Sequence, residues 1–316
     1  MPSIVAHADW SKDARKRWIA IAHLRGTQYH LTQTRPAGSP QSLIESLKTE
    51  ASGSPVLVGF DFPIGLPKAY AARVDLPDFR TALRSLGSGD WHEFFSVAAT
   101  AAEISLHRPF YPYRPGGTSR AQLSSTLHLH FDALYRLCER RTFSLPCPLF
   151  WTLGAKQVGR AAISGWRDLL QPALYQSGGN VGLWPFDGSL DTLLRSRQVV
   201  ICETYPAEAY VRIGLNAALG RRWSKRSPED RVELGRTMLG WAKLHRMVLE
   251  PDAERQIAKG FGRRPEGEDA FDAMVGLLGM IDALTSGETE PPEGPAAIRD
   301  IEGWILGCTT SGATDL

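Results

Sequence analysis

Residues 56–67 read VLVGFDFPIGLP, and this stretch decides the fold that we expect for the chain. Val56–Val58 is apolar without alternating polar residues, which is typical of a strand buried on both faces of a sheet. Gly59 keeps the backbone slim, and Pro63 cannot continue the hydrogen-bond ladder, so the strand should end at Asp61. Ligands of open α/β sheets bind at the edge where parallel strands end. Asp61 is therefore the first candidate for a functional side chain.

The segments around this strand predict an α/β fold with a mixed sheet. Three strands joined by short links precede it and should form an antiparallel meander, at residues 3–8, 17–24 and 28–34. A helix with Ser39 as N-cap and Pro40 at its first position then leads into the central strand. A second buried strand, at 198–204, contains Glu203 near its end. Strands that follow helices favour parallel pairing with right-handed crossovers.

Between residues 68 and 197 helical segments, Gly/Pro loops and many aromatic residues replace the clean strand pattern. We therefore expect a discontinuous core of residues 1–67 and 198–308, interrupted by a mainly helical insertion at 68–197. Residues 309–316 are expected to be a flexible tail. Three further elements are predicted by their local pattern, namely helices at 123–138 and 156–170 and a short edge strand at 301–306.

The composition favours a soluble globular protein, since 43% of the 316 residues are hydrophobic and 22% are charged. The net charge of +2 gives no global attraction to nucleic acid or membranes. Four cysteines without CxxC spacing argue against a zinc site or a disulfide framework and fit a cytoplasmic location. No signal-peptide pattern precedes the first strand and no apolar run approaches ~18 residues, so we expect no membrane partner.

Carboxylates from separate strands are predicted to meet at one edge of the sheet. The first strand ends at Asp9. If this strand is central, it pairs with the second strand on one side and with the Asp61 strand on the other, which places Asp9 beside Asp61. The strand that ends at Glu203 would follow next to the Asp61 strand.

A late helix adds two more acids to this edge. Residues 268–284 read EDAFDAMVGLLGMIDAL, which is apolar nearly all round and indicates a largely buried helix. Asp269 and Asp272 are three residues apart and so lie on one helix face. Gly276 and Gly279 continue that face and would let the helix approach the sheet closely. Acids in a first turn also complement the helix dipole, which is the alternative explanation for Asp269.

Carboxylates gathered in one pocket repel each other, and burying each of them unpaired would cost roughly several kcal/mol. A divalent cation removes this penalty, and a ligand set of oxygens alone suits Mg²⁺ or Mn²⁺. Two such ions about 4 Å apart can activate a water and stabilise a leaving oxygen in phosphodiester cleavage. We assign Asp9, Asp61 and Asp272 as metal ligands, with Glu203 and Asp269 assisting catalysis.

Five segments resemble those of the DUF429 family, whose members are predicted to be RNase H-like nucleases: HADWS, VGFDFPIGLP, CETYPAEAY, EDAFDAMVGL and EGWILG. The resemblance covers most of the chain and is weakest in the insertion. It implies an RNase H-like core in which Asp9 matches the acid of the first strand and Asp61 that of the fourth. Asp269 or Asp272 would match the acids of the last core helix, and Glu203 falls on the fifth strand.

Basic residues of the insertion are the candidates for substrate contacts, namely Arg114, Arg120, Lys156 and Arg160. Those near Tyr111 and Tyr113 suit binding of a single strand by stacking, and the alternative is a tyrosine-rich loop packed on its own domain. A second basic cluster, made of Arg221, Arg222, Lys225 and Arg226, is interpreted as a solvated face.

The function that we expect is metal-dependent phosphodiester hydrolysis on nucleic acid, DNA or RNA. One alternative is an ATP-dependent phosphotransferase on a related core, although the sequence contains no glycine-rich phosphate loop of the Walker A or GxGxxG type. The other is a non-catalytic nucleic-acid-binding or structural module, whose acids end strands and cap helices. The sequence leaves the oligomeric state open.

Overall fold

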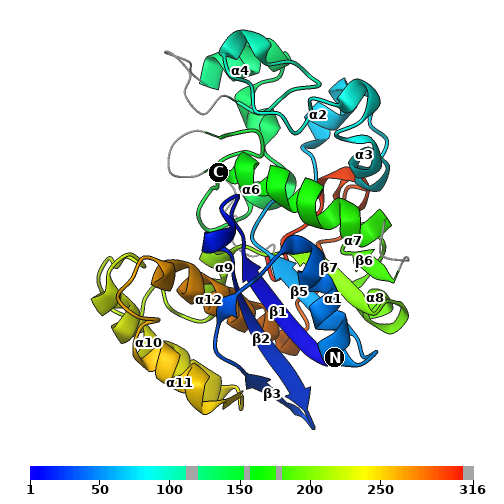
Figure 1. Ribbon diagram of the computed structural model, residues 1–316. Coiled ribbons are helices and arrows are strands. Elements are labelled where there is room, and N and C mark those ends of the chain that lie inside the picture. The colour runs from blue at the N-terminus through cyan, green and yellow to red at the C-terminus, as the bar shows by residue number, and fades with distance from the viewer. Residues whose placement is uncertain (112–119, 153–156, 176–179, 309–316) are drawn as a thin grey trace.

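The computed structural model describes residues 1–111, 120–152, 157–175 and 180–308. At its centre the described chain forms an eight-stranded mixed sheet in the order β6-β7-β5-β1-β2-β3-β8, with β4 paired to β2 (Figure 1). The strands are β1 (Ile4–Asp9), β2 (Trp18–Arg25), β3 (Gln28–Leu31), β4 (Arg35–Pro36), β5 (Val56–Phe60), β6 (Val181–Leu183), β7 (Val199–Glu203) and β8 (Val248–Leu249).

Helices cover both faces of this sheet. The α-helices are α1 (Pro40–Ala51), α2 (Lys68–Arg73), α3 (Phe79–Ser85), α4 (Arg120–Leu127), α5 (Leu137–Arg140), α6 (Val158–Gly165), α7 (Gln171–Tyr175), α8 (Leu190–Ser196), α9 (Pro206–Arg212), α10 (Pro228–Leu244), α11 (Pro251–Ala258) and α12 (Glu266–Ser286). Short 3₁₀ turns are η1 (Ala14–Lys16), η2 (Gly89–Trp91), η3 (Ala101–Glu103) and η4 (Phe131–Leu134), and π-helical turns are η5 (Trp166–Leu170) and η6 (Ile298–Glu302).

The α/β class and the pairing predicted for the central strands are confirmed. Strand β1 is antiparallel to β2 on one side and parallel to β5 on the other, and β5 is in turn parallel to β7. The predicted N-cap is also present, because the Ser39 side chain accepts from Ser42 N before α1, and Ser227 caps α10 in the same way by accepting from Asp230 N.

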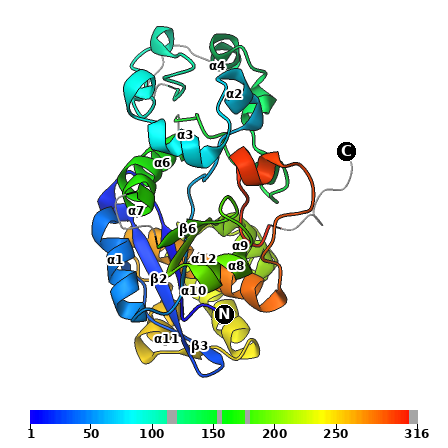
Figure 2. The same cartoon turned by 90° about the vertical axis from the view of Figure 1, so that its right-hand side faces the viewer.

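Alternate residues of the central strands face two different cores. In β1 and β5, even positions such as Val58 and Phe60 pack in a cluster with α1 residues, whereas odd positions such as Val5 and Leu57 pack in a cluster with α12 residues. Figure 2 shows the sheet between α1 on one side and α9 and α12 on the other. The burial of β5 on both faces, which its unbroken apolar run predicts, is therefore confirmed.

The segment expected as an insertion is only partly outside the sheet. Its last part supplies the edge strand β6, which pairs in parallel with β7. Its helices α2, α3 and α4 lie above the sheet (Figure 1). Apolar side chains of these helices, such as Tyr70 and Phe79, join the same core as the strands. Trp166 of η5 also stacks on Phe94 at 6.2 Å and donates from Nε1 to the Pro63 carbonyl at 2.6 Å. Residues 68–197 are therefore built onto the core.

Three predicted elements differ from those observed. The helix expected at 123–138 is broken into α4, η4 and α5, with His128 in the left-handed region at φ 52°. The helix expected at 156–170 begins at Val158 and continues through η5 into α7. The strand expected at 301–306 is wrong, because η6 occupies its start and Gly303 reverses the chain at φ 71°, leaving one bridge between Ile305 and Glu203.

Two remaining expectations concern the tail and the membrane. Residues 309–316 lie outside the described residues. Within the described part of the chain, no helix combines the length and the apolar character needed to cross a membrane.

Candidate functional site

The register of β1 and β5 places Asp9 beside Asp61. Ala8 of β1 pairs with Phe60 of β5, so the residues that follow them, Asp9 and Asp61, lie at the same level of the sheet. Both aspartates occupy odd positions and therefore project toward α12. Their carboxyl groups lie within hydrogen-bonding reach of each other, and Asp61 Oδ1 also accepts the Trp10 backbone N–H at 2.6 Å. The two strand-end acids predicted to be neighbours are thus brought together.

Asp272 approaches the same place from α12. Helix α12 packs against β1 and β2, and the Asp272 side chain is buried at the edge where β1 ends. Tyr210 of α9 donates its hydroxyl to Asp272 Oδ1, and Lys225 Nζ donates to Asp272 Oδ2. Asp272 therefore has two partners of its own, and sequence reasoning had identified neither of them at this site.

Burial and neighbouring charges raise the pKa values of the two strand-end acids. Burial, followed by the charges of Asp61 and Asp272, raises the pKa of Asp9 well above its ordinary range. Burial likewise raises the pKa of Asp61 to about 7, although hydrogen bonds with Trp10 and Asp9 act in the opposite direction. With Lys225 as the neighbouring cation, the Asp9–Asp61 pair favours holding a proton at neutral pH.

The side chain of Lys225 supplies positive charge to this cluster. Burial alone lowers the pKa of a lysine, but Asp272, Asp9 and Asp61 outweigh it and raise the pKa of Lys225 above its ordinary value. Burial, then the charge of Asp272, raises the pKa of Tyr210 well above its usual range. Lys225 is thus charged and Tyr210 neutral at physiological pH. The expectation that the 221–226 cluster is only a solvated face is wrong for Lys225.

Asp269 lies one turn before Asp272, at the periphery of the cluster. Burial raises the pKa of Asp269 to about 6, opposed by the charge of Lys16 and reinforced by that of Asp272. It is not among the residues that line the cleft described below. Asp269 therefore contributes negative charge from the first turn of α12, as the helix-dipole alternative also allows.

Glu203 is directed away from the aspartates. It occupies the position opposite Phe60 in the β5–β7 pair, so it faces the α1 side of the sheet. There Arg136 binds it through two hydrogen bonds, from Nη2 to Oε1 at 2.6 Å and from Nη1 to Oε2 at 2.7 Å. Ile64 N also donates to Glu203 Oε2 at 2.6 Å. The structure does not bring Glu203 to the cluster, and its buried ion pair joins β7 to α5.

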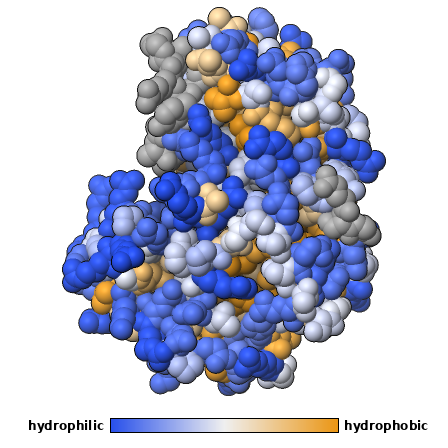
Figure 3. Space-filling model, viewed as in Figure 1, coloured by the Kyte–Doolittle hydropathy of each residue, from blue (hydrophilic) through white to orange (hydrophobic). Residues whose placement is uncertain are grey.

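A cleft of about 830 Å³ opens above the three aspartates, which form its floor. The cleft lining includes basic residues and aromatic residues, namely Lys12, Lys16, Arg160, Lys225 and Arg226, and Trp10, Tyr205, Tyr210 and Trp223. This side of the molecule is hollowed between the upper helices and the α10–α12 lobe, with mainly hydrophilic residues around the hollow (Figure 3). The volume lies within the roughly 300–1,000 Å³ typical of ligand sites.

The four residues predicted to contact substrate have different outcomes. Arg160 of α6 lines the cleft. Arg120 lies over the Phe131 ring at 4.9 Å and is not part of the cleft lining. Arg114 and Lys156 lie outside the described residues.

The chemistry of the donor set suits a hard divalent cation, since Asp9, Asp61 and Asp272 offer only oxygen. The observed positions of these side chains do not form a metal site, because no group of three or more His, Cys, Asp or Glu side chains in the described chain is positioned to hold a metal ion. Lys225 occupies Oδ2 of Asp272, and the two strand-end acids contact each other. The three aspartates therefore fit such an ion in type, and Asp272 would have to exchange Lys225 for it.

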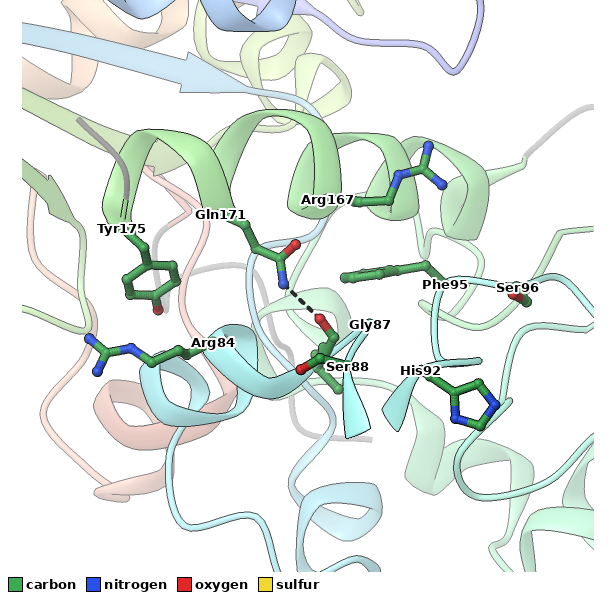
Figure 4. A pocket seen from close by; sticks show the side chains of 10 residues that line it. Arg84, Gly87, Ser88, His92, Phe95, Ser96, Arg167, Gln171 and Tyr175 are labelled. Carbon is green, nitrogen blue, oxygen red and sulfur yellow. Dashed lines mark hydrogen bonds between the residues drawn. The ribbon is translucent and has the colours of Figure 1, made fainter. Parts of the chain in front are cut away.

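A second hollow, of about 450 Å³, lies between α3, α7 and the chain around Gly87 (Figure 4). Gln171 crosses it and donates to the Leu86 carbonyl at 2.7 Å. Its lining in the described chain contains arginines, His92 and Tyr175 but no carboxylate, and Arg167 is paired with Asp168 at 2.7 Å. This hollow lacks the acid cluster of the cleft above the aspartates, so we place the candidate site at that cleft.

Comparisons with known protein families, with curated proteins and with solved structures give no match to this chain. The resemblance to the DUF429 family therefore stays an expectation from the sequence. The candidate site rests on the geometry described above.

Proposed function

We propose that this protein hydrolyses phosphodiester bonds of nucleic acid with the help of a divalent metal ion, on an RNase H-like core. The observation that carries the proposal is the meeting of Asp9, Asp61 and Asp272 in one cleft whose lining also contains basic side chains. Buried acids this close together favour a nearby counter-charge, and basic side chains beside them suit an anionic substrate.

The residues of the cleft have distinct roles in this proposal. Asp9, Asp61 and Asp272 would hold Mg²⁺ or Mn²⁺, which when bound makes water a better nucleophile and offsets charge on the phosphoryl oxygens. The Trp10 backbone N–H fixes one oxygen of Asp61, and Tyr210 fixes one oxygen of Asp272. Lys225, which lines the cleft, would be released from Asp272 and contact a substrate phosphate. Glu203 has no part in the chemistry, because Arg136 holds both of its oxygens.

The test is Mn²⁺-dependent cleavage of labelled DNA and RNA by the wild-type protein and by Asp61→Asn. The amide keeps the acceptor for Trp10 N–H but removes the charge, so we expect cleavage to fall by roughly 100-fold or more. Asp90→Asn, an exposed site outside the cleft, is the matched control and should retain full activity. Equal cleavage by the wild type and Asp61→Asn would reject the proposal.

A non-catalytic binding module is the second candidate, and one observation favours it. Lys225 and Tyr210 already satisfy Asp272, so the cluster has an internal cation. Calorimetry with Mn²⁺ separates the two candidates. A hydrolase should bind the ion through Asp61 and lose binding in Asp61→Asn, whereas a binding module should show no heat of Mn²⁺ binding in either protein.

A further inference from the structure

Two exposed apolar side chains, Phe143 and Leu145, come just before a segment that lines the cleft. In the described chain the exposed large hydrophobic residues are Met1, Phe143, Leu145, Val211 and Leu244. Phe143 is 72% exposed and Leu145 53% exposed. They stand next to Pro146 and Cys147, which line the cleft. An exposed aromatic ring beside a cleft with basic residues offers a face on which a nucleic-acid base can stack.

The backbone that carries Phe143 is held in place. Phe143 N donates to the Glu208 carboxylate, and Glu208 follows directly after the cleft-lining segment 205–207. Tyr205 donates its hydroxyl to the Ser144 carbonyl at 3.3 Å. The ring is therefore displayed from a fixed loop, which reduces the ordering needed when a ligand binds.

The charge of the cleft complements a phosphate backbone. The cleft lining includes the basic residues Lys16, Lys225 and Arg226. Arg226 is 75% exposed at its side chain, and its ion pair with Glu268 is long at 3.8 Å. The floor is much less accessible, since Asp9 is 9% exposed and Asp272 is 3% exposed. A ligand must therefore bring its phosphate deep into the cleft while its remainder passes the rim.

We propose that the cleft takes single-stranded nucleic acid, with a base stacked on the ring of Phe143 and the backbone along Lys16 and Arg226. This inference rests on the proposed function for the choice of nucleic acid as substrate. Non-specific single-strand sites combine a basic groove with aromatic rings on which bases stack. A duplex keeps its bases paired inside the helix, so it cannot offer one to Phe143 while a phosphate reaches the floor.

The experiment is fluorescence anisotropy with a labelled single strand of ten nucleotides and with the matching duplex, in EDTA so that no cleavage occurs. We expect the single strand to bind at least tenfold more tightly than the duplex. Phe143→Ala should weaken single-strand binding at least fivefold, because base stacking is lost. Leu244→Ala is the matched control, since Leu244 is 78% exposed and lies outside the cleft lining.

A second variant tests the contribution of the basic residues that line the cleft. Arg226→Glu should weaken single-strand binding and reduce its dependence on salt, whereas Arg73→Glu, an exposed position outside the cleft, should not. Duplex binding equal to single-strand binding would overturn the inference, and so would equal binding by Phe143→Ala and Leu244→Ala. If single strands bind as expected but Mn²⁺ gives no cleavage, the hydrolase proposal fails and the binding site stands.

Discussion

At the residue scale, the register between neighbouring strands decides which acids reach the cluster. Asp9 and Asp61 follow β1 and β5 at equivalent positions and project toward α12. Glu203 is one residue earlier relative to this register, opposite Phe60, and projects to the other face. A shift of one residue reverses the direction of a side chain in a strand. Glu203 therefore meets Arg136 while the two aspartates meet Asp272.

The raised pKa of Asp61 predicts how stability depends on pH in the absence of divalent ions. The folded-state pKa is about 7, above the roughly 3.9 of an unfolded chain, so the fold favours the protonated acid. This contribution is fully present below the unfolded pKa and is lost as pH rises through the folded pKa. Between pH 5 and pH 8 the wild type should therefore lose free energy of unfolding that Asp61→Asn does not lose.

Denaturant unfolding in EDTA at several pH values measures this difference. At pH 8 we expect Asp61→Asn to be more stable than the wild type by on the order of 2 kcal/mol. Asp90→Asn, at an exposed site, should follow the wild-type curve. Parallel pH curves for the wild type and Asp61→Asn would contradict the account of a strained acid pair.

At the scale of elements, the close approach of α12 to β1 depends on Gly276. A Cβ at this position would lie 2.2 Å from the ring of His7. That ring is buried and fixed by a 3.0 Å hydrogen bond between Nδ1 and the Ala273 carbonyl, and burial lowers the pKa of His7 to about 4. The expectation that small residues on α12 allow close packing is confirmed here, whereas Gly279 approaches Ala209 of α9.

Gly276→Ala should therefore push α12 away from the sheet. We expect a loss of about 1–3 kcal/mol in the free energy of unfolding, the usual range for overpacking. Gly240→Ala on α10 is the control, because its Cβ would have no neighbour within 4 Å and alanine favours helix. Thermal and denaturant unfolding of both variants check this prediction, and equal stability of the two would refute the close packing of α12.

At the scale of the whole molecule, the upper helices and the sheet share one apolar core. The ring of Phe62 lies after β5, and a Cβ at Gly165 of α6 would be 2.4 Å from that ring. Arg17 at the start of β2 donates to Ser164 Oγ at 2.8 Å. Separation of residues 68–197 from the sheet would expose this packing, so the two parts should unfold together.

Equilibrium unfolding should therefore show one transition. We expect near-UV dichroism, which reports the aromatic packing of the upper helices, to coincide with far-UV dichroism, which reports all helices and strands. Two resolved transitions would mean that residues 68–197 behave as an independent domain.

The sequence predicted much of the fold but only part of the site. Strand ends carry local signals, such as Pro63 after β5, so Asp9 and Asp61 could be found as neighbours from chain order. The partners Lys225 and Arg136 could not, because they lie in basic clusters that look solvated and reach their acids only through distant loops. No spacing in the chain marks Tyr210 as the partner of Asp272 either.

By itself the sequence determined the order of the central strands, the N-cap of α1, and the acids at the ends of β1 and β5. These features depend on short-range chemistry: hydrophobic periodicity, turn residues and the geometry of proline and glycine. The tertiary structure alone decided that Glu203 faces Arg136 and that Lys225 faces Asp272. Those pairings depend on register and on the packing of separate elements, which bring together charges that no local pattern links.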